Sequence, residues 1–192
     1  MTRIRPASTN VHGRAGDDRA ARIADSIGAV FAHRPQAYRA YIEAEQALQA
    51  SGTLSPRLVE LVRLRIAFHN QCRTCMATRR APDVVSEDLV CSLERPYEAP
   101  DLSEEERAAL RFADLFAADH LSIDDAEYDK LRAFFSEAEL VELGMRCAFF
   151  VGFGRLTATW DVVEDLPSSF SQQDFTAPWG HQEVVEFAPF VE

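Results

Sequence analysis

The chain has 192 residues and a formal net charge of −11. It is long enough to bury a core of its own, and its charge disfavours binding to nucleic acid or to an anionic membrane surface. No apolar run reaches the roughly 18 residues that a transmembrane helix needs. The segment 1–22 is polar and lacks the apolar core of a signal peptide, so we expect a cytoplasmic protein.

Two helices are expected in the first quarter of the chain. Residues 1–20 mix charged residues, glycine and proline without an apolar period, and we expect a mobile arm there. Apolar residues at helical spacing predict a helix over 23–31 that stops before Pro35. A second helix is expected with a broad apolar face over 38–48, which Glu45 interrupts, and with its end at the C-cap 51–52.

A third helix should begin at Ser55 and Pro56, because serine caps free N–H groups and proline suits the first turn. This helix is apolar nearly all round, which is typical of a central, buried helix, and it should end near 69–71. A new helix is then expected from Cys72 through Arg80, with the next proline as its end.

The second half of the chain is also helical in pattern. A short helix over 83–93 and a loop over 96–101 precede Ser103, which opens a helix with a capping box. A further helix is expected over 124–135. The last long helix begins after Ser136.

Two glycines and an aromatic tail mark the end of the helical pattern. Gly152 and Gly154 either interrupt the last helix or permit close packing. The tail 167–192 carries aromatic residues among acids and prolines, and we expect it to dock on its own subunit or on a neighbour. No convincing strand signal is present. The predicted class is therefore all-α, with residues 21–166 as the helical domain between the arm and the tail.

One short sequence occurs twice. Leu-Val-Glu-Leu spans 58–61 and again 140–143, each time shortly after a capping serine and at the start of a long apolar helix. This pattern indicates a degenerate two-fold repeat of a helical hairpin. The alternative is a chance similarity between two amphipathic helices.

The chemistry of the chain centres on the cysteine pair Cys72 and Cys75. A close pair in a cytoplasmic protein indicates redox chemistry or metal binding. At a helix start, free N–H groups favour a thiolate, which can attack a peroxide or a disulfide while the second thiol resolves the intermediate. The alternatives are half of a zinc site, which lacks a second close ligand pair, and two inert core thiols. The arginines of 57–80 are either solvated or create a local positive field around the pair.

The segment 60–75 resembles the carboxymuconolactone decarboxylase-like superfamily, and within it the alkylhydroperoxidase D-like branch. That branch has a glutamate, eleven residues, Cys-x-x-Cys, three residues and a histidine, and the spacing from Glu60 to Cys72 matches it. Flanking features agree, including the glycine-containing segment at 153–156. The resemblance covers roughly residues 23–166.

The resemblance implies an all-α bundle that assembles into a homo-oligomer: a dimer, trimer or hexamer. It implies that Cys75 attacks, that Cys72 resolves and that Glu60 draws the proton away. Members of this branch reduce organic hydroperoxides, a peroxiredoxin-type antioxidant activity, without a bound cofactor or metal. Their electrons come from an external dithiol such as a lipoyl group or a thioredoxin-like protein.

One position departs from the family pattern, because Arg79 replaces the histidine. Arginine cannot relay a proton near neutral pH, although its charge can stabilise a thiolate. His69 could serve as the relay instead, or could be an ordinary helix-end residue. Arg79 could be a solvated helix residue, and Glu60 could be a surface or ion-paired residue.

The leading functional prediction is a thiol peroxidase or disulfide reductase. A decarboxylase or lactone-processing enzyme of the same superfamily is an alternative, and the cysteine pair counts against it. A non-enzymatic helical oligomer that senses redox state is the other alternative. Peroxide turnover with a dithiol donor distinguishes the peroxidase from the redox sensor.

Overall fold

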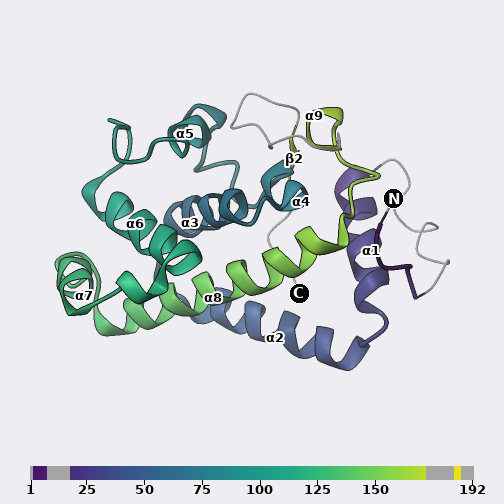
Figure 1. Ribbon diagram of the computed structural model, residues 1–192, viewed down its shortest axis with the longest axis horizontal. Coiled ribbons are helices and arrows are strands. Elements are labelled where there is room, and N and C mark those ends of the chain that lie inside the picture. Colours follow the sequence, from purple (N-terminus) through teal and green to yellow (C-terminus); the bar gives the residue numbers. More distant parts are fainter. Residues whose placement is uncertain (1, 8–17, 172–183, 187–192) are drawn as a thin grey trace.

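The computed structural model describes residues 2–7, 18–171 and 184–186, and within these ranges the chain is mostly helical, as expected (Figure 1). The elements follow in the order α1 (Arg19–Phe31), α2 (Pro35–Ser51), α3 (Pro56–His69), α4 (Arg73–Ala77), β1 (Thr78–Arg79), α5 (Glu87–Ser92), α6 (Glu104–Ala118), the 3-10 helix η2 (His120–Ser122), α7 (Asp125–Leu131), α8 (Glu137–Trp160), α9 (Ser168–Ser171) and β2 (Val185–Glu186). No helix in the described ranges combines the length and apolar character needed to cross a bilayer.

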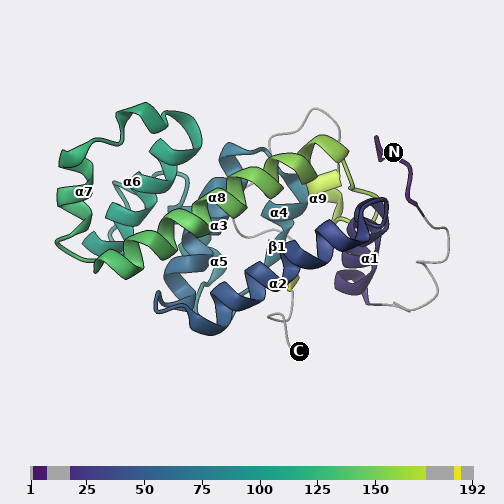
Figure 2. The same ribbon diagram turned by 90° about the horizontal axis from the view of Figure 1, so that it is seen from below.

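Helix α3 is the centre of the fold, as its all-round apolar sequence predicts. It packs most extensively against α6 and α8, and the two views in Figures 1 and 2 show it between these helices and α5. Three hydrophobic clusters meet on it. Leu58 faces α6 and α8, Leu64 faces α5, and Ala67 faces α1, α4 and α9. Burying each large aliphatic side chain contributes about 2 kcal/mol, so α3 is a rigid platform for the segment that follows it.

The predicted starts of α3, α6 and α8 are confirmed, each at a serine that caps the first turn. The helix expected over 83–93 begins later, at Glu87, after the cap Ser86. The Ser55 hydroxyl accepts from the N–H of Leu58. Ser103 and Ser136 each form a complete capping box with a glutamate three residues later. These interactions are local, which explains why the sequence alone located them.

Helix α8 is continuous through both glycines, so they permit close packing and do not interrupt it. A Cβ on Gly154 would lie 2.5 Å from Asn70 Nδ2, whereas one on Gly152 would meet nothing within 4 Å. Asn70 ends α3, and its amide donates to the carbonyl oxygen of Phe150 at 2.8 Å. Gly154 therefore lets α8 approach the end of α3 closely.

The helix expected from Cys72 through Arg80 is wrong in its second half. Helix α4 ends at Ala77, and Thr78 and Arg79 form β1, which pairs in parallel with β2. The carbonyl oxygens of Cys75 and Thr78 accept from the guanidinium of Arg63. Because the buried guanidinium donates to these carbonyl oxygens, their hydrogen bonds are made without a further turn of helix.

The described parts of the two terminal segments pack on the body of the same chain. In the arm, the Arg3 N–H donates to the carbonyl oxygen of Trp160, while residues 8–17 lie outside the described ranges. In the tail, Phe170 is fully buried and Val185 is buried beside it. Four tail aromatics that drew attention in the sequence lie outside the described residues: Phe175, Trp179, Phe187 and Phe190.

The two copies of the repeated sequence place a buried glutamate at the same point. Glu60 on α3 pairs with Arg63, and Glu142 on α8 pairs with Arg146. Both carboxylates also accept from backbone N–H groups of a neighbouring segment, Glu60 from Arg80 and Glu142 from Thr53. The two-fold repeat itself stays a prediction.

Candidate functional site

The two cysteines of the motif are joined in a disulfide at the start of α4, with their Cα atoms 5.2 Å apart. Cys72 is the N-cap residue, and its sulfur accepts from the N–H of Cys75 at 3.3 Å. Gln71 makes the turn from α3 into α4 with a positive φ of 47°. This tight turn brings the disulfide back against the C-terminal end of α3.

The two sulfur-bearing residues differ in their access to solvent. Cys72 is fully buried, whereas Cys75 is partly exposed and lines a cavity of about 360 Å³. The walls of the cavity come from α1, α2, α3, α4 and α8. Most of the lining side chains are aromatic or aliphatic: Ile27, Phe31, Tyr38, Tyr41, Ile42, Phe149, Phe150 and Phe153. The polar and charged ones beside Cys75 are Glu45, Arg63, Thr74, Thr78, Arg80 and Thr157.

Glu60 is held in a buried ion pair beside the dithiol segment. Its two oxygens accept from Arg63 Nε at 2.6 Å and Nη2 at 2.7 Å, and the Arg80 N–H donates to it at 2.9 Å. Burial by itself would raise the pKa of Glu60, but the charge and hydrogen bonds of Arg63 outweigh it and lower the pKa below its ordinary value. Glu60 is therefore an ionised partner of Arg63, which agrees with the alternative that it is an ion-paired residue.

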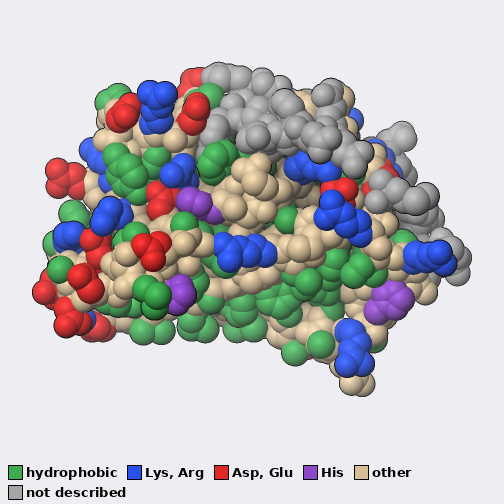
Figure 3. Space-filling model, viewed as in Figure 1, with side chains coloured by type: hydrophobic (Ala, Val, Ile, Leu, Met, Phe, Trp, Pro, Cys, Tyr) green, Lys and Arg blue, Asp and Glu red, His purple; other side chains and the backbone are tan. Residues whose placement is uncertain are grey.

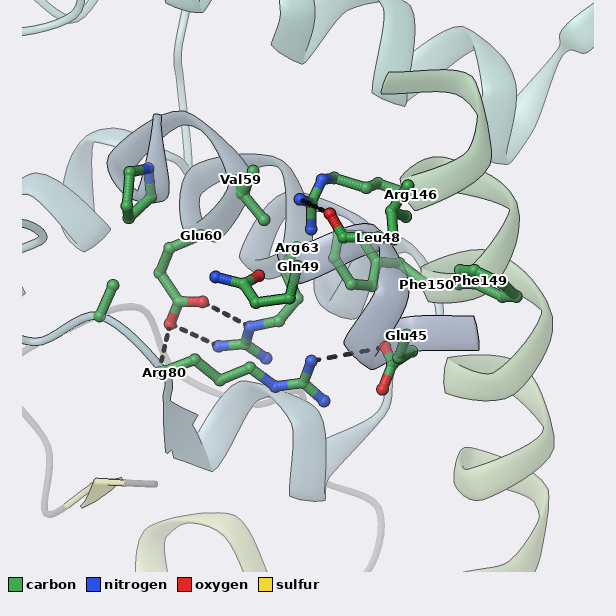
Figure 4. Close-up of a pocket in the computed structure, with 12 residues that line it drawn as sticks. Glu45, Leu48, Gln49, Val59, Glu60, Arg63, Arg80, Arg146, Phe149 and Phe150 are labelled. Carbon is green, nitrogen blue, oxygen red and sulfur yellow. Dashed lines mark hydrogen bonds and ion pairs between the residues drawn. The ribbon is translucent and has the colours of Figure 1, made fainter. Parts of the chain in front are cut away.

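Figure 4 shows this pair in a second, smaller pocket of about 70 Å³, which shares walls with the Cys75 cavity. The Arg80 side chain reaches across it to Glu45 on α2, with Arg80 Nη1 3.6 Å from Glu45 Oε1. Glu45, Arg63 and Arg80 line both pockets, whereas Glu60 lines only the smaller one. Glu60 thus meets the cavity that Cys75 faces only through its partner Arg63 and the neighbouring Arg80.

His69 turns toward α6 and not toward the disulfide. Its Nε2 lies 2.6 Å from Asp114 Oδ1, and the same carboxylate accepts from Arg65 and from the hydroxyl of Tyr97. Burial would raise the pKa of Asp114, but hydrogen bonds from His69, Arg65 and Tyr97 bring it down to about 2. The polar contacts of His69 are therefore those of a helix-end residue.

Arg79 is buried and paired with Glu87 on α5. Its Nε donates to Glu87 Oε1 at 2.6 Å and its Nη1 to the carbonyl oxygen of Met76 at 2.7 Å. It does not line the Cys75 cavity. Arg80, the next residue along the chain, lines it instead. The expectation of a solvated Arg79 is wrong, and a role for it in holding the thiolate has no contact in support.

Every arginine of the basic stretch 57–80 pairs with a carboxylate, so neither of the two alternatives, solvated arginines or an uncompensated positive field, describes the stretch as a whole. The pairs are Arg57–Glu106, Arg63–Glu60, Arg65–Asp114, Arg73–Asp161, Arg79–Glu87 and Arg80–Glu45. Four of the acids belong to distant elements. The stretch therefore ties α3 and α4 to the surrounding helices, and its charge is largely compensated.

The other two cysteines are not activated. Cys147 is fully buried in the core, and burial raises the pKa of its thiol. Burial and the neighbouring acids Asp88 and Glu87 raise the pKa of Cys91. Neither lines the cavity. Among the four cysteines, only Cys75 lines this cavity.

Three residues of the Cys75 cavity had not been predicted from the sequence: Glu45, Tyr41 and Arg80. One signal was present, because Glu45 lies within an otherwise apolar helix face. A lone acid in an apolar stripe needs a buried partner. The sequence could not show that this partner was Arg80, which lies just after β1.

The fold and the site together define an all-α protein with a Cys-x-x-Cys disulfide at the wall of an aromatic cavity. Two solved structures share this arrangement of helices. A protein of unknown function from Agrobacterium tumefaciens, assigned provisionally to antioxidant defence proteins of the AhpD type, is 26% identical, with a TM-score of 0.60 over 68% of this chain and 91% of that one. A peroxidase-related protein from Ralstonia eutropha JMP134, described as an alkylhydroperoxidase AhpD core, is 22% identical, with a TM-score of 0.62 over 76% of this chain and 78% of that one.

The chain thus has the AhpD-like fold, and the resemblance found in the sequence is confirmed. No family model matches the sequence. Two uncharacterized proteins from Mycobacterium tuberculosis, one from strain CDC 1551 and one from strain H37Rv, are each 38% identical over 95 residues. That match covers 47% of this chain and 33% of each relative, so the chain spans about a third of their length.

Proposed function

We propose that the protein is a thiol-dependent peroxidase or disulfide reductase that uses the Cys72–Cys75 dithiol. The observation that carries this proposal is the unequal placement of the two residues: Cys75 lines the aromatic cavity and Cys72 is fully buried behind it. A substrate in the cavity meets Cys75 first. Cys75 is therefore the attacking thiol and Cys72 the resolving one.

The surroundings of the two sulfurs suit these roles. Arg63 and Arg80 line the cavity with Cys75, and a nearby cation favours a thiolate. The Cys75 N–H donates to the sulfur of Cys72, and a backbone donor stabilises a thiolate there as it attacks or leaves. Reduction of the disulfide by an external dithiol would begin at Cys75, with Cys72 as the leaving group.

The cavity favours an apolar hydroperoxide over hydrogen peroxide. Its walls carry the rings of Phe31, Tyr41, Phe150 and Phe153 among others, and an alkyl or aryl group loses water on entering such a site. The electron donor would be a dithiol such as a lipoyl group or a thioredoxin-like protein. The Agrobacterium tumefaciens neighbour, assigned provisionally to antioxidant defence, supports the same class of activity.

The surface supports a homo-oligomer as part of this proposal. Val141, Met145 and Leu156 are exposed along α8. Figure 3 shows hydrophobic side chains gathered along the lower part of the face in view, where Figure 1 places α8 and α2. None of the residues of α2 is fully buried. A second copy would cover such a surface. The cytoplasmic location and the absence of a nucleic-acid partner stay predictions.

The test is steady-state consumption of an aryl hydroperoxide with dihydrolipoamide as donor. We expect Cys75→Ser to abolish turnover, because the attacking sulfur is lost. Cys91→Ser is the matched control, since Cys91 lies outside the cavity, and its rate should equal that of the wild type. Turnover that survives in Cys75→Ser would contradict the mechanism. A wild type that oxidises reversibly but shows no turnover would favour the redox-sensing alternative.

A further inference from the structure

The cavity that Cys75 faces contains a single carboxylate among its described lining residues, and it is not Glu60. It is Glu45, from α2, whose side chain is only 9% exposed. Both oxygens of Glu60 are occupied by Arg63, and one of them also accepts from the Arg80 N–H. An acid that must exchange a proton with a group inside the cavity has to lie on its wall.

Glu45 lies between a cation and a phenol on that wall. Arg80 Nη1 is 3.6 Å from its carboxylate (Figure 4). Burial raises the pKa of Tyr41 well above its ordinary value, and the charge of Glu45 and a hydrogen bond to it act in the same direction. Tyr41 therefore keeps its proton and orients the carboxylate as a donor. The three side chains form one polar patch in an otherwise apolar cavity.

The other titratable groups on the cavity wall do not compete for this role. Helix α2 also contributes Tyr38, whose pKa is raised by burial and by Glu45. Helix α3 contributes Arg63 and the segment after β1 contributes Arg80, and a guanidinium has no acceptor site for a proton. The lining residues from α1 and α8 carry no titratable side chain. Glu45 is thus the one group on the described wall, apart from Cys75, that can accept and return a proton.

We propose that Glu45 is the proton-transfer residue of the Cys75 cycle, because Arg79, which replaces the histidine of the family pattern, cannot take that role. This inference rests on the proposed peroxidase function. Glu45 accepts the proton of the Cys75 thiol. The thiolate attacks the terminal peroxide oxygen, the O–O bond breaks, and sulfur is oxidised to sulfenic acid while an alkoxide leaves. Glu45 returns the proton to the alkoxide, which departs as the alcohol. Cys72 then displaces water from the sulfenic acid to form the disulfide.

The experiment compares Glu45→Gln with Glu43→Gln, an exposed glutamate two residues earlier on the same helix. The first readout is kcat/KM for an aryl hydroperoxide between about pH 5 and 9, since general acid–base catalysis contributes roughly 100-fold or more. We expect Glu45→Gln to lose about 100-fold and to flatten the pH profile. Glu43→Gln should match the wild type.

The second readout is the rate of Cys75 alkylation by iodoacetamide in the Cys72→Ser background, which reports the equilibrium fraction of Cys75 thiolate and needs no proton returned to the leaving iodide. Glu45→Gln removes a negative charge beside Arg80, so alkylation should be unchanged or faster although turnover falls. A parallel fall in both rates would mark a structural role and overturn the assignment. Wild-type values of kcat/KM and pH profile in Glu45→Gln would overturn it too. A wild type without peroxide turnover would overturn the peroxidase proposal itself, together with this role of Glu45.

Discussion

Arg63 connects α3 to the dithiol segment, because its Nη1 donates to the carbonyl oxygen of Cys75 at 2.8 Å. Its Nη2 reaches the carbonyl oxygen of Thr78 at 2.8 Å, while Glu60 holds the other side of the guanidinium. The position of Cys75 at the cavity wall is thus fixed through one buried cation. Glu60 contacts the dithiol segment through Arg63, and we propose that it helps to position this segment.

The buried pair should make Glu60 costly to neutralise. In Glu60→Gln, the Arg63 charge stays buried without its carboxylate, and we expect a loss of about 3 kcal/mol in the free energy of unfolding. Urea denaturation measures it, with Glu43→Gln as the exposed control. The double variant Glu60→Gln/Arg63→Met should recover part of the loss, because no unpaired charge remains. A change below about 1 kcal/mol in Glu60→Gln would contradict a buried, ionised pair.

Asp114 should make stability depend on acid pH. Its pKa falls from 3.8 to about 2 on folding, so the folded form binds the proton more weakly and the stabilisation is present above the unfolded value. It is lost as the pH falls toward about 2. We expect the difference in unfolding free energy between wild type and Asp114→Asn to shrink by about 1 kcal/mol from about pH 6 to about pH 3. A difference that stays constant over this range would contradict the shift.

The two glycines of α8 should respond in opposite directions to alanine. Gly154→Ala places a Cβ against Asn70, which must move away from the carbonyl oxygen of Phe150 and from Arg155. We expect a loss of about 1–2 kcal/mol, the size of one or two hydrogen bonds. Gly152→Ala meets open space and should gain about 0.5–1 kcal/mol from helix propensity. Thermal unfolding of both variants measures the contrast, and equal shifts would show that α8 does not approach Asn70 closely.

The tail should contribute to stability through Val185. This residue pairs with Thr78 in the parallel β1–β2 ladder and is buried next to Met76 and Phe170. Val185→Asp puts a charge there and should lower the unfolding free energy by about 2–3 kcal/mol. Glu186→Gln, at the exposed neighbour, should leave it unchanged. Wild-type stability in Val185→Asp would mean that β2 does not dock on β1.

Local signals in the sequence predicted most of the fold. The starts of α3, α6 and α8 follow from Ser55, Ser103 and Ser136, because a cap and its partner lie within one turn. The central position of α3 follows from its composition. The end of α4 could not be predicted, since β2 and Arg63, which determine it, come from distant parts of the chain.

The site was predicted only in part, because its charged residues contact distant parts of the chain. The spacing located Cys72 and Cys75, and it identified Glu60 as a neighbour of their segment. The spacing could not show toward which helix each charged side chain points. Arg79 turns to α5 and Arg80 turns to α2, although they are adjacent in sequence. In an extended strand successive side chains point to opposite faces, and β1 ends between these two residues.

The most direct test of the central claim is to trap the oxidised sulfur. In reduced Cys72→Ser no resolving thiol remains, so one equivalent of an aryl hydroperoxide should leave a sulfenic acid on Cys75, which dimedone captures and peptide mass spectrometry locates. If Cys75 is the attacking thiol, we expect a peroxide-dependent adduct on Cys75 and none on Cys91 or Cys147, whose thiol pKa values are raised. An adduct that forms on Cys72 in Cys75→Ser at the same rate, or no adduct at all, would contradict it.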